Sequence, residues 1–302
     1  MRHLTHLKYI DVVAKEKSIR KASEKLSITS TALNRRIIAL EDEIGTPIFE
    51  RLPSGVRLNT AGELLIQHVR FQIKDLSRVL SQIADLSGNR RGHVNITCNS
   101  TTIGNFLSFQ IAKYRSNFPE VTFDIKRSNT DNSLKSLKNF EADIAIVFDS
   151  VLPSDVQIIS STNQNLYLLL NINHPLIDYE KIKLQQCIEF PLILHNEMEG
   201  IKNLINIWEL KNSYKFKHII TTDSNEFMIN YSQYENSISF HLPISFSRDT
   251  KNLKYQLIDE KDAIKGSLHI IQSKGRVLPV AAAKFVDQML VDLNKKFPNE
   301  TR

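Results

Sequence analysis

Residues 18–40 read SIRKASEKLSITSTALNRRIIAL, and their apolar residues recur at helical spacing on both sides of a short break at Ser27-Ile28-Thr29. Ser18 is a favourable N-cap for the helix before the break. The apolar positions are Ile19, Ala22 and Leu26 before the break, and Leu33, Ile37 and Leu40 after it. Two short helices joined by three or four residues form a helix-turn-helix, whose second helix enters the major groove of DNA.

The helix after the break has a polar face that points away from its apolar stripe. This face carries Ser30, Thr31, Ala32, Asn34, Arg35 and Ile38. Amide and guanidinium groups suit base edges, because Asn can pair with adenine and Arg with guanine. All of these residues except Ile38 are therefore candidate DNA contacts. The alternative is an ordinary surface helix, since any amphipathic helix turns polar residues outward.

The flanking sequence completes a small domain. Upstream, a further helix is predicted by apolar residues at spacings of three: Leu4, Leu7, Ile10 and Val13. Downstream, two extended segments flank a turn at Pro53-Ser54-Gly55 and predict a hairpin, the wing of a winged helix. Arg51 and Arg57 lie beside this turn and are candidate contacts to phosphates or a minor groove. We expect residues 1–62 to form a winged helix-turn-helix DNA-binding domain.

A long helix follows the wing. Between Gly62 and Ser87-Gly88 there is no proline and no internal glycine, which predicts one helix over about 63–88. Its apolar residues recur at spacings of three and four: Leu65, Val69, Ile73, Leu76, Leu80 and Ile83. So narrow a stripe on so long a helix favours pairing with a partner helix. We therefore expect a homodimer.

From residue 92 onward the pattern changes to alternating strands and helices. Strands are predicted at 94–98, 121–125 and 142–147, with helices at 103–116 and 134–140 between them. This order predicts a parallel sheet with helices on both faces. Later elements form a second such unit: strands at 166–170, 190–194, 217–221, 237–240 and 268–271, and helices at 201–210 and 279–295. In the last helix we expect Ala283, Val286 and Leu290 to face inward.

Residues 4–62 resemble the N-terminal domain of LysR-type transcriptional regulators. The matching motifs are Leu7-x-x-Ile10-x-x-Val13, Ser18-Ile19-Arg20-Lys21-Ala22-Ser23-x-x-Leu26, Ile37-x-x-Leu40-Glu41-x-x-Ile44-Gly45-x-x-Ile48-Phe49-x-Arg51 and Leu58-x-x-Ala61-Gly62. Weaker matches follow at Arg91-Gly92, Tyr114-x-x-x-Phe118-Pro119, Asp143-Ile144-Ala145-Ile146, His174-Pro175-Leu176 and Leu242-Pro243. The resemblance implies an α/β protein overall, with a dimerising linker helix at 63–88 and an effector-binding domain at 92–302. That domain resembles two-lobed periplasmic binding proteins, with lobe I at about 92–162 plus 268–302 and lobe II at about 163–267. The family resemblance also implies a homotetramer as the alternative to a homodimer.

A ligand site is expected where strands end and helices begin, because helix N-termini there offer free backbone donors. Asn99, Ser100, Thr101 and Thr102 occupy such a place after the first strand of the second half. Backbone N–H groups, hydroxyls and a helix dipole would suit an anionic small molecule. The alternative is a plain N-cap with solvated hydroxyls. By analogy with the family, His195, Asn196 and Thr222 are expected to face this segment, although a lone histidine is more often a surface or hinge residue.

The composition of the chain indicates which kinds of binding partner to expect. The formal net charge is +6, and residues 1–62 hold eleven Lys or Arg against seven Asp or Glu, so the excess is concentrated in the predicted DNA-binding domain. The two cysteines, Cys98 and Cys187, cannot build a disulfide scaffold and fit a reducing compartment. A redox-sensing pair is the alternative to two packed side chains. No signal peptide and no long apolar run is visible, so we expect a cytoplasmic protein without a membrane partner.

The sequence shows no nucleotide-binding glycine motif, no hydrolase motif and no CxxC pair, so we expect neither catalysis nor a metal or cofactor. These observations predict a sequence-specific transcriptional regulator that senses a small molecule. Three alternatives stay open at this stage: a transport-type binding protein, an enzyme on a two-lobed fold, and a structural DNA-binding protein without an effector.

Overall fold

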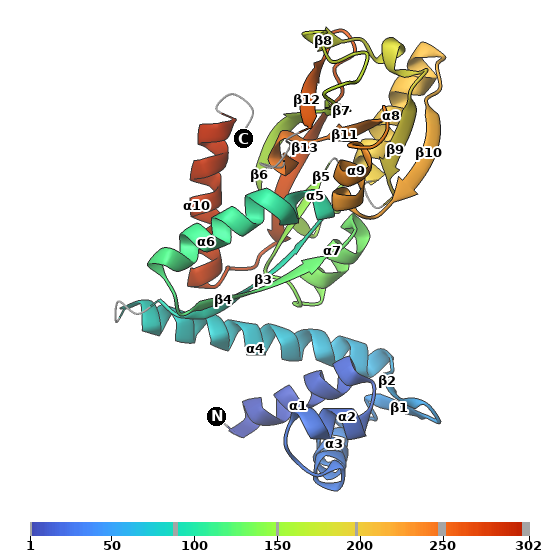
Figure 1. The fold of residues 1–302 in the computed structure, drawn as a ribbon. Coiled ribbons are helices and arrows are strands. Elements are labelled where there is room, and N and C mark those ends of the chain that lie inside the picture. Colours follow the sequence, from blue (N-terminus) through green and yellow to red (C-terminus); the bar gives the residue numbers. More distant parts are fainter. Residues whose placement is uncertain (1, 87–89, 149–150, 197–198, 247–251, 298–302) are drawn as a thin grey trace. The chain divides into compact units, whose positions relative to one another are not determined.

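The computed structural model describes residues 2–86, 90–148, 151–196, 199–246 and 252–297. The chain divides into two compact units, residues 1–87 and residues 88–302, which are taken in turn (Figure 1). Residues 87–89 of the predicted polar connector lie outside the described residues. No helix in the described ranges is both long and apolar enough to cross a membrane.

The N-terminal unit contains the predicted helix-turn-helix. Its helices are α1 (Arg2–Glu16), α2 (Ile19–Lys25) and α3 (Ser30–Ile44). The Ser18 hydroxyl caps α2 by accepting a hydrogen bond from the backbone N–H of Lys21, and Thr29 caps α3 by accepting one from Ala32. Gly45 ends α3 in the left-handed region, at φ 80°, where glycine carries no steric penalty.

The wing is a two-stranded antiparallel hairpin of β1 (Phe49–Leu52) and β2 (Gly55–Leu58). The Glu41 carboxylate at the end of α3 accepts hydrogen bonds from the backbone N–H groups of Ile48 and Phe49, at 2.8 and 3.2 Å. The N–H of Val56 donates to the carbonyl of Lys17 at 2.9 Å. The hairpin is thus attached by its backbone to α3 and to the end of α1.

The long helix α4 (Thr60–Leu86) uses its apolar stripe in two ways. Ile66 and Val69 are buried among residues of α1, α2 and α3, and Leu65 and Ile73 pack on the same cluster. Arg70 extends this contact through an ion pair with Asp11 of α1, at 2.7 Å. Leu80 and Ile83, near the other end, remain exposed. Within the described helix, the first half of the predicted stripe is covered by the core of the N-terminal unit, whereas Leu80 and Ile83 in the second half are exposed.

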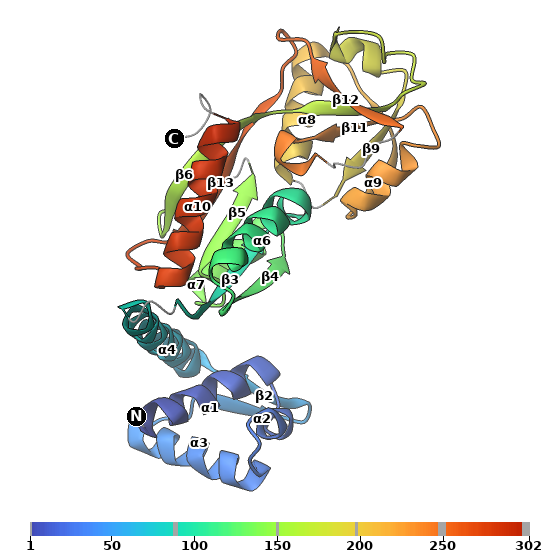
Figure 2. The same cartoon turned by 60° about the vertical axis from the view of Figure 1, so that its left-hand side comes forward.

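One lobe of the C-terminal unit contains a five-stranded sheet in the order β4-β3-β5-β13-β6 (Figure 2). The strands are β3 (Gly92–Cys98), β4 (Val121–Arg127), β5 (Ile144–Phe148), β6 (Val156–Asn165) and β13 (Lys265–Ser273). The predicted parallel core of β3, β4 and β5 is present. However, β13 runs antiparallel to both β5 and β6, so the sheet is mixed and the prediction of a parallel sheet was wrong for this side.

Helices cover both faces of this sheet, as predicted. A continuous helical segment runs through α5 (Ser100–Thr102), a π-helical turn η1 (Ile103–Leu107) and α6 (Ser108–Asn117), and it packs beside α10 (Val280–Lys296). On the other face α7 (Thr130–Lys138) contributes Leu137 to a separate cluster with Ala145 and Val147. In α10 the prediction was right for Val286, but Ala283 and Leu290 are only half-buried. The fully inward positions are Ala281, Ala282, Phe285, Val286, Met289 and Leu293.

The other lobe contains a six-stranded sheet in the order β10-β9-β11-β7-β12-β8. Its strands are β7 (Tyr167–Asn171), β8 (Lys181–Ile182), β9 (Pro191–His195), β10 (Lys217–Thr222), β11 (Ile238–His241) and β12 (Leu253–Ile258). Short helical turns η2 (Leu184–Cys187) and η3 (Pro243–Ser245) and two helices, α8 (Glu199–Asn212) and α9 (Asn225–Tyr231), complete it. The chain passes between the lobes twice, from β6 into β7 and from β12 into β13.

Candidate DNA-binding and effector-binding sites

The polar face of α3 lies on the surface, as the helical wheel predicted. Leu33 and Ile37 are 0% and 3% exposed in the core of the unit, whereas Thr31 and Arg35 are exposed. Ala32 and Asn34 are half-buried at the margins of this face. The burial of one stripe therefore orients the opposite stripe outward, which is the arrangement that a major groove requires.

Ser30 has a partner within the protein. Its hydroxyl lies 2.8 Å from the hydroxyl of Ser23, which in turn donates to the backbone carbonyl of Arg20 in α2. This chain of hydrogen bonds connects the first turn of α3 to α2. Ser30 thus lies at the junction of the two helices, and the residue is still exposed to solvent.

The two wing arginines are both exposed and both held by neighbours. Arg51 donates to the Asn34 side-chain oxygen at 2.8 Å, which joins the wing to the polar face of α3. Arg57 pairs with Glu50, its register partner across the hairpin, at 2.7 Å. The first contact brings Arg51 of the wing to Asn34 of α3, and the second holds Arg57 within the hairpin.

A pocket of about 590 Å³ lies between the two lobes of the C-terminal unit. One wall comes from the helical segment that begins at Ser100 and from Arg127 at the end of β4. The other comes from α9, Ser245 and Asn252. Most of the lining side chains in the described ranges carry amides or hydroxyls, and the charged ones there are Arg127 and Glu226.

Ser100 is the predicted ligand residue that lines this pocket. Its hydroxyl lies 2.8 Å from Nε2 of His195, which belongs to the other lobe. His195 is 4% exposed, so it is no surface histidine. Burial, assisted by the charge of Arg127, lowers its pKa from 6.5 to about 4, so the imidazole is neutral at pH 7. The contact is thus a neutral hydrogen bond between lobes.

Among the predicted ligand residues whose side chains the structure describes, Asn99, Thr102, Asn196 and Thr222 do not line the pocket and instead support the segments around it. Thr102 is buried and donates to the carbonyl of Asn99 at 3.0 Å. Asn99 is 6% exposed, and its side-chain oxygen has no hydrogen-bond partner among the described residues. Asn196 is exposed and donates its backbone N–H to the carbonyl of Thr222, at 2.8 Å. The side chain of Thr101 lies outside the described part of the structure.

Several lining residues were missed by sequence reasoning, and Arg127 is the most informative. It ends β4, beside the carboxyl end of β3, where the rule for ligand sites in α/β sheets would have placed it. Its guanidinium lies 3.3 Å from the carboxylate of Asp223 in the other lobe. The α9 residues Glu226, Ile229 and Asn230 lacked any signal, because that helix was not predicted.

Both cysteines are buried, and they belong to different lobes. Burial raises the pKa of Cys98 to about 11 and, with the nearby charge of Asp262, that of Cys187 to about 12. Both thiols are therefore protonated at pH 7 and are poor nucleophiles. The described residues contain no cluster of three or more His, Cys, Asp or Glu that could hold a metal ion.

Comparisons with known proteins cover nearly the whole chain. Residues 4–63 match the family of bacterial regulatory helix-turn-helix proteins of the lysR family, and residues 87–293 match the LysR substrate binding domain. The uncharacterized HTH-type transcriptional regulator YbhD of Escherichia coli strain K12 is 27% identical over 94% of this chain and 90% of its own length.

Solved structures agree in fold. A full-length variant of OxyR from Pseudomonas aeruginosa has a TM-score of 0.74 at 17% identity, covering 96% of this chain and 94% of its own. Full-length CbnR, solved in complex with its target DNA, has a TM-score of 0.65 at 15% identity, covering 95% of this chain and 98% of its own.

Proposed function

Because this chain belongs to the LysR family of DNA-binding transcriptional regulators, which its two matched domains establish, we propose that the exposed face of α3 reads an operator. The family consists of regulators and not of enzymes, and its C-terminal domain binds small-molecule effectors. In this chain the DNA-binding domain spans residues 1–62, the linker helix 63–88 and the effector-binding domain 92–302. The protein acts in the cytoplasm as a homodimer or homotetramer.

The DNA contacts divide into two groups. Thr31, Asn34 and Arg35 read base edges, with Ser30 and Ala32 beside them, and Arg51 with Arg57 contacts the backbone. The supporting observation is the 2.8 Å hydrogen bond from Arg51 to Asn34, which holds the wing against the reading face. Arg35 is exposed on that face and is free to reach a guanine.

The effector is a small polar molecule with an anionic group, and it binds in the pocket between the lobes. Ser100 supplies a hydroxyl at the start of a helical segment, and Arg127 supplies a positive charge on the same wall. Glu226 on the opposite wall favours a hydrogen-bond donor elsewhere on the ligand. Neighbouring Asn99, Thr102, His195, Asn196 and Thr222 position the segments that carry these groups.

Regulation follows from differential binding. A ligand shifts a protein between two arrangements only by as much as it binds one of them better. The polar contacts between the lobes, Ser100 with His195 and Arg127 with Asp223, are present in this arrangement. An effector that strengthens or replaces them changes the relation between the lobes, and through the oligomer the placement of the DNA-binding domains.

Operator binding is tested with the DNA immediately upstream of the protein's own gene against scrambled DNA, over a series of salt concentrations. Arg35→Ala is compared with Arg36→Ala, since Arg36 is on the same helix but lies over the ring of Tyr9 at 4.8 Å. We expect Arg35→Ala to lose about 1–3 kcal/mol of specific binding and Arg36→Ala to lose less. Equal binding to both DNAs, steeply salt-dependent and indifferent to Arg35, would show a nonspecific DNA binder instead.

A further inference from the structure

A second pocket of about 580 Å³ lies in the C-terminal unit, between α6 and α10. Its inner surface is apolar: Phe106 is 8% and Ile244 1% exposed, and Phe246 continues this surface toward the lobe crossing. Phe109 on α6 is 48% exposed at its edge. The effector proposal uses none of these four side chains.

The rim of this pocket is basic. Among the described residues that line it, Lys113, Lys295 and Lys296 are cationic and Asp292 alone is acidic. Lys296 is positioned by a hydrogen bond to the carbonyl of Pro243, at 3.1 Å. With three ammonium groups against one carboxylate, this lining has a surplus of positive charge above an apolar floor.

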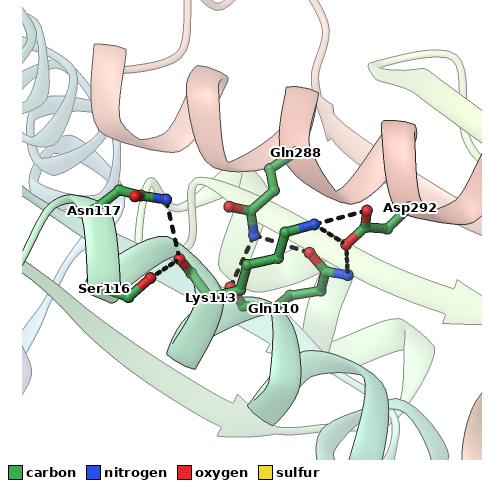
Figure 3. Close-up of polar contacts among 6 residues, drawn as sticks. All are labelled: Gln110, Lys113, Ser116, Asn117, Gln288 and Asp292. Carbon is green, nitrogen blue, oxygen red and sulfur yellow. Dashed lines mark hydrogen bonds and ion pairs between the residues drawn. The ribbon is translucent and has the colours of Figure 1, made fainter.

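Asp292 hydrogen-bonds to Lys113 and also lies within electrostatic reach of Lys295, and it balances one of the three positive charges, so the described lining keeps a surplus of two. It accepts two hydrogen bonds from Lys113, at 2.8 and 2.6 Å, and one from the buried Gln110 at 2.8 Å (Figure 3). Gln288 donates to the carbonyl and the side-chain oxygen of Gln110, both at 2.9 Å. This network fixes α6 against α10 and leaves the pocket preformed, which lowers the entropy cost of binding.

The second pocket shares a wall with the pocket between the lobes. Asn105, in the π-helical turn, lines both, and its side chain donates to the backbone carbonyl of Phe246. Ser245 lines the first pocket and its neighbour Phe246 the second. Single π-helical turns inside helices are frequent at functional sites.

We propose that the pocket between α6 and α10 is a second ligand site, which takes a small organic anion with an aromatic or alkyl body. The apolar body packs on Phe106, Phe109 and Phe246, and the anionic group lies at Lys295 and Lys296. Apolar walls with a few charged groups at one end are the usual composition of a small-molecule site. Through Asn105, occupation of this site alters the wall of the effector pocket, so that the two ligands influence each other's affinity.

The test uses the full-length protein and 6-fluoro-2-naphthoate as the probe, followed by fluorine NMR. The site variant is Lys295→Gln/Lys296→Gln, and the matched control is Lys284→Gln, which is on the same helix and pairs with Asp287 outside the pocket. We expect saturable binding that weakens at least tenfold in the site variant and not in Lys284→Gln. The neutral analogue 6-fluoro-2-naphthamide should bind at least tenfold more weakly than the naphthoate.

Two further measurements locate the probe. Arg127→Gln, which alters the pocket between the lobes, should leave unchanged the naphthoate binding that depends on Lys295 and Lys296. Loss of binding in Arg127→Gln alone would place the probe in the effector pocket and overturn the proposal. The proposal would also be overturned if the probe did not bind at millimolar concentration, or if it bound equally well to Lys295→Gln/Lys296→Gln. A site variant that changes the sedimentation coefficient but not probe binding would identify the groove as a subunit contact instead.

Discussion

His174, His195 and His241 are buried in the C-terminal unit and are kept uncharged by that burial. Desolvation lowers their pKa values from 6.5 to about 4, 4 and 3 respectively. When His195 is protonated, its positive charge lowers the pKa of the nearby His241 further. Three neutral imidazoles in one folded unit make its stability depend on pH.

We expect acid to destabilise the C-terminal unit. Because the folded pKa values lie below the unfolded value of 6.5, the unfolded state binds more protons between pH 6.5 and 4. The stability is therefore complete above pH 6.5 and is lost as the pH falls toward 4. Between pH 7 and pH 5 the free energy of unfolding should fall by about 2 kcal/mol per histidine. Urea unfolding followed by the fluorescence of Trp208, the single tryptophan, measures it.

His174→Asn separates this effect from other titrations. The asparagine oxygen can replace Nδ1, which accepts a hydrogen bond from the N–H of Leu176 at 3.1 Å. The variant should lose about a third of the pH dependence that the three buried histidines produce. Equal free energies of unfolding at pH 7 and pH 5 would contradict the prediction.

At single positions, sequence reasoning succeeded where the local helix pattern sufficed. It predicted that Leu33 and Ile37 face the core and that Thr31 and Arg35 do not. It did not find that Arg51 holds Asn34, because those residues are 17 positions apart and the hairpin brings them together. Thr102 was expected to face the ligand, but its side chain is buried and donates to the carbonyl of Asn99.

The junction of the wing and α4 has no room for a side chain at Gly62. A Cβ there would lie 2.1 Å from the carbonyl oxygen of Ile48 and 2.9 Å from Cδ2 of Leu58. Gly62→Ala should destabilise the N-terminal unit by about 1–3 kcal/mol, because a backbone oxygen cannot rotate away. Chemical denaturation followed by circular dichroism measures this loss.

Gly104→Ala provides the matched comparison for that substitution. Gly104 is also helical, but a Cβ there meets nothing within 4 Å. Its replacement should leave stability unchanged or raise it by about 0.5–1 kcal/mol, as expected when alanine replaces glycine in a helix. Similar losses of stability in both variants would mean that the close approach to Ile48 does not cause the destabilisation of Gly62→Ala.

The second half of α4 is expected to join two copies of the chain. Leu80 and Ile83 are 50% and 55% exposed on this helix, one turn apart. Leu80→Glu/Ile83→Glu should therefore shift the sedimenting species to monomer and weaken operator binding, since paired half-sites need a dimer. Gln82→Glu adds a charge on the same turn, where Gln82 accepts from Arg78, and should leave the assembly intact. An assembly that survives the double variant would exclude this half of α4 as the contact.

The helices and strands with a regular apolar pattern were predictable from the sequence, whereas the polar ones were not. β6 reads VQIISSTNQN and lacks an apolar run, because it is an edge strand with one solvated side. Its position is determined by pairing with β13, about a hundred residues later. The same pairing made the sheet mixed, which no periodicity within β3, β4 or β5 could reveal.

For the whole C-terminal unit, the sharpest question is the charge of its effector. Arg127 is the cationic residue among the described residues that line the pocket, and its exposed pair with Asp223 adds at most about 1 kcal/mol to stability. Arg127→Gln should weaken carboxylate effectors at least tenfold, whereas Asp223→Asn should bind them equally well or better, because it removes a carboxylate that competes for the guanidinium. The readout is the thermal shift produced by a panel of metabolite carboxylic acids.

Arg115→Gln is the control for that panel, since Arg115 is exposed on α6 and does not line the pocket. It should preserve every shift that the unmodified protein gives. Shifts that persist in Arg127→Gln, or a panel in which only amines and neutral molecules bind, would contradict an anionic effector. The DNA-binding measurement is independent of this outcome.

The sequence alone determined the helix-turn-helix, the wing, the long helix and the alternation of strands and helices, because each depends on residues within a few turns of one another. It also located Ser100 at the start of a helical segment. Only the tertiary structure decided which strands are neighbours and which side chains share a pocket. Ser100, Arg127, Glu226 and Ser245 meet because the chain crosses twice between the lobes. Contacts between such distant residues depend on sheet order and closure of the fold, which local spacing does not specify.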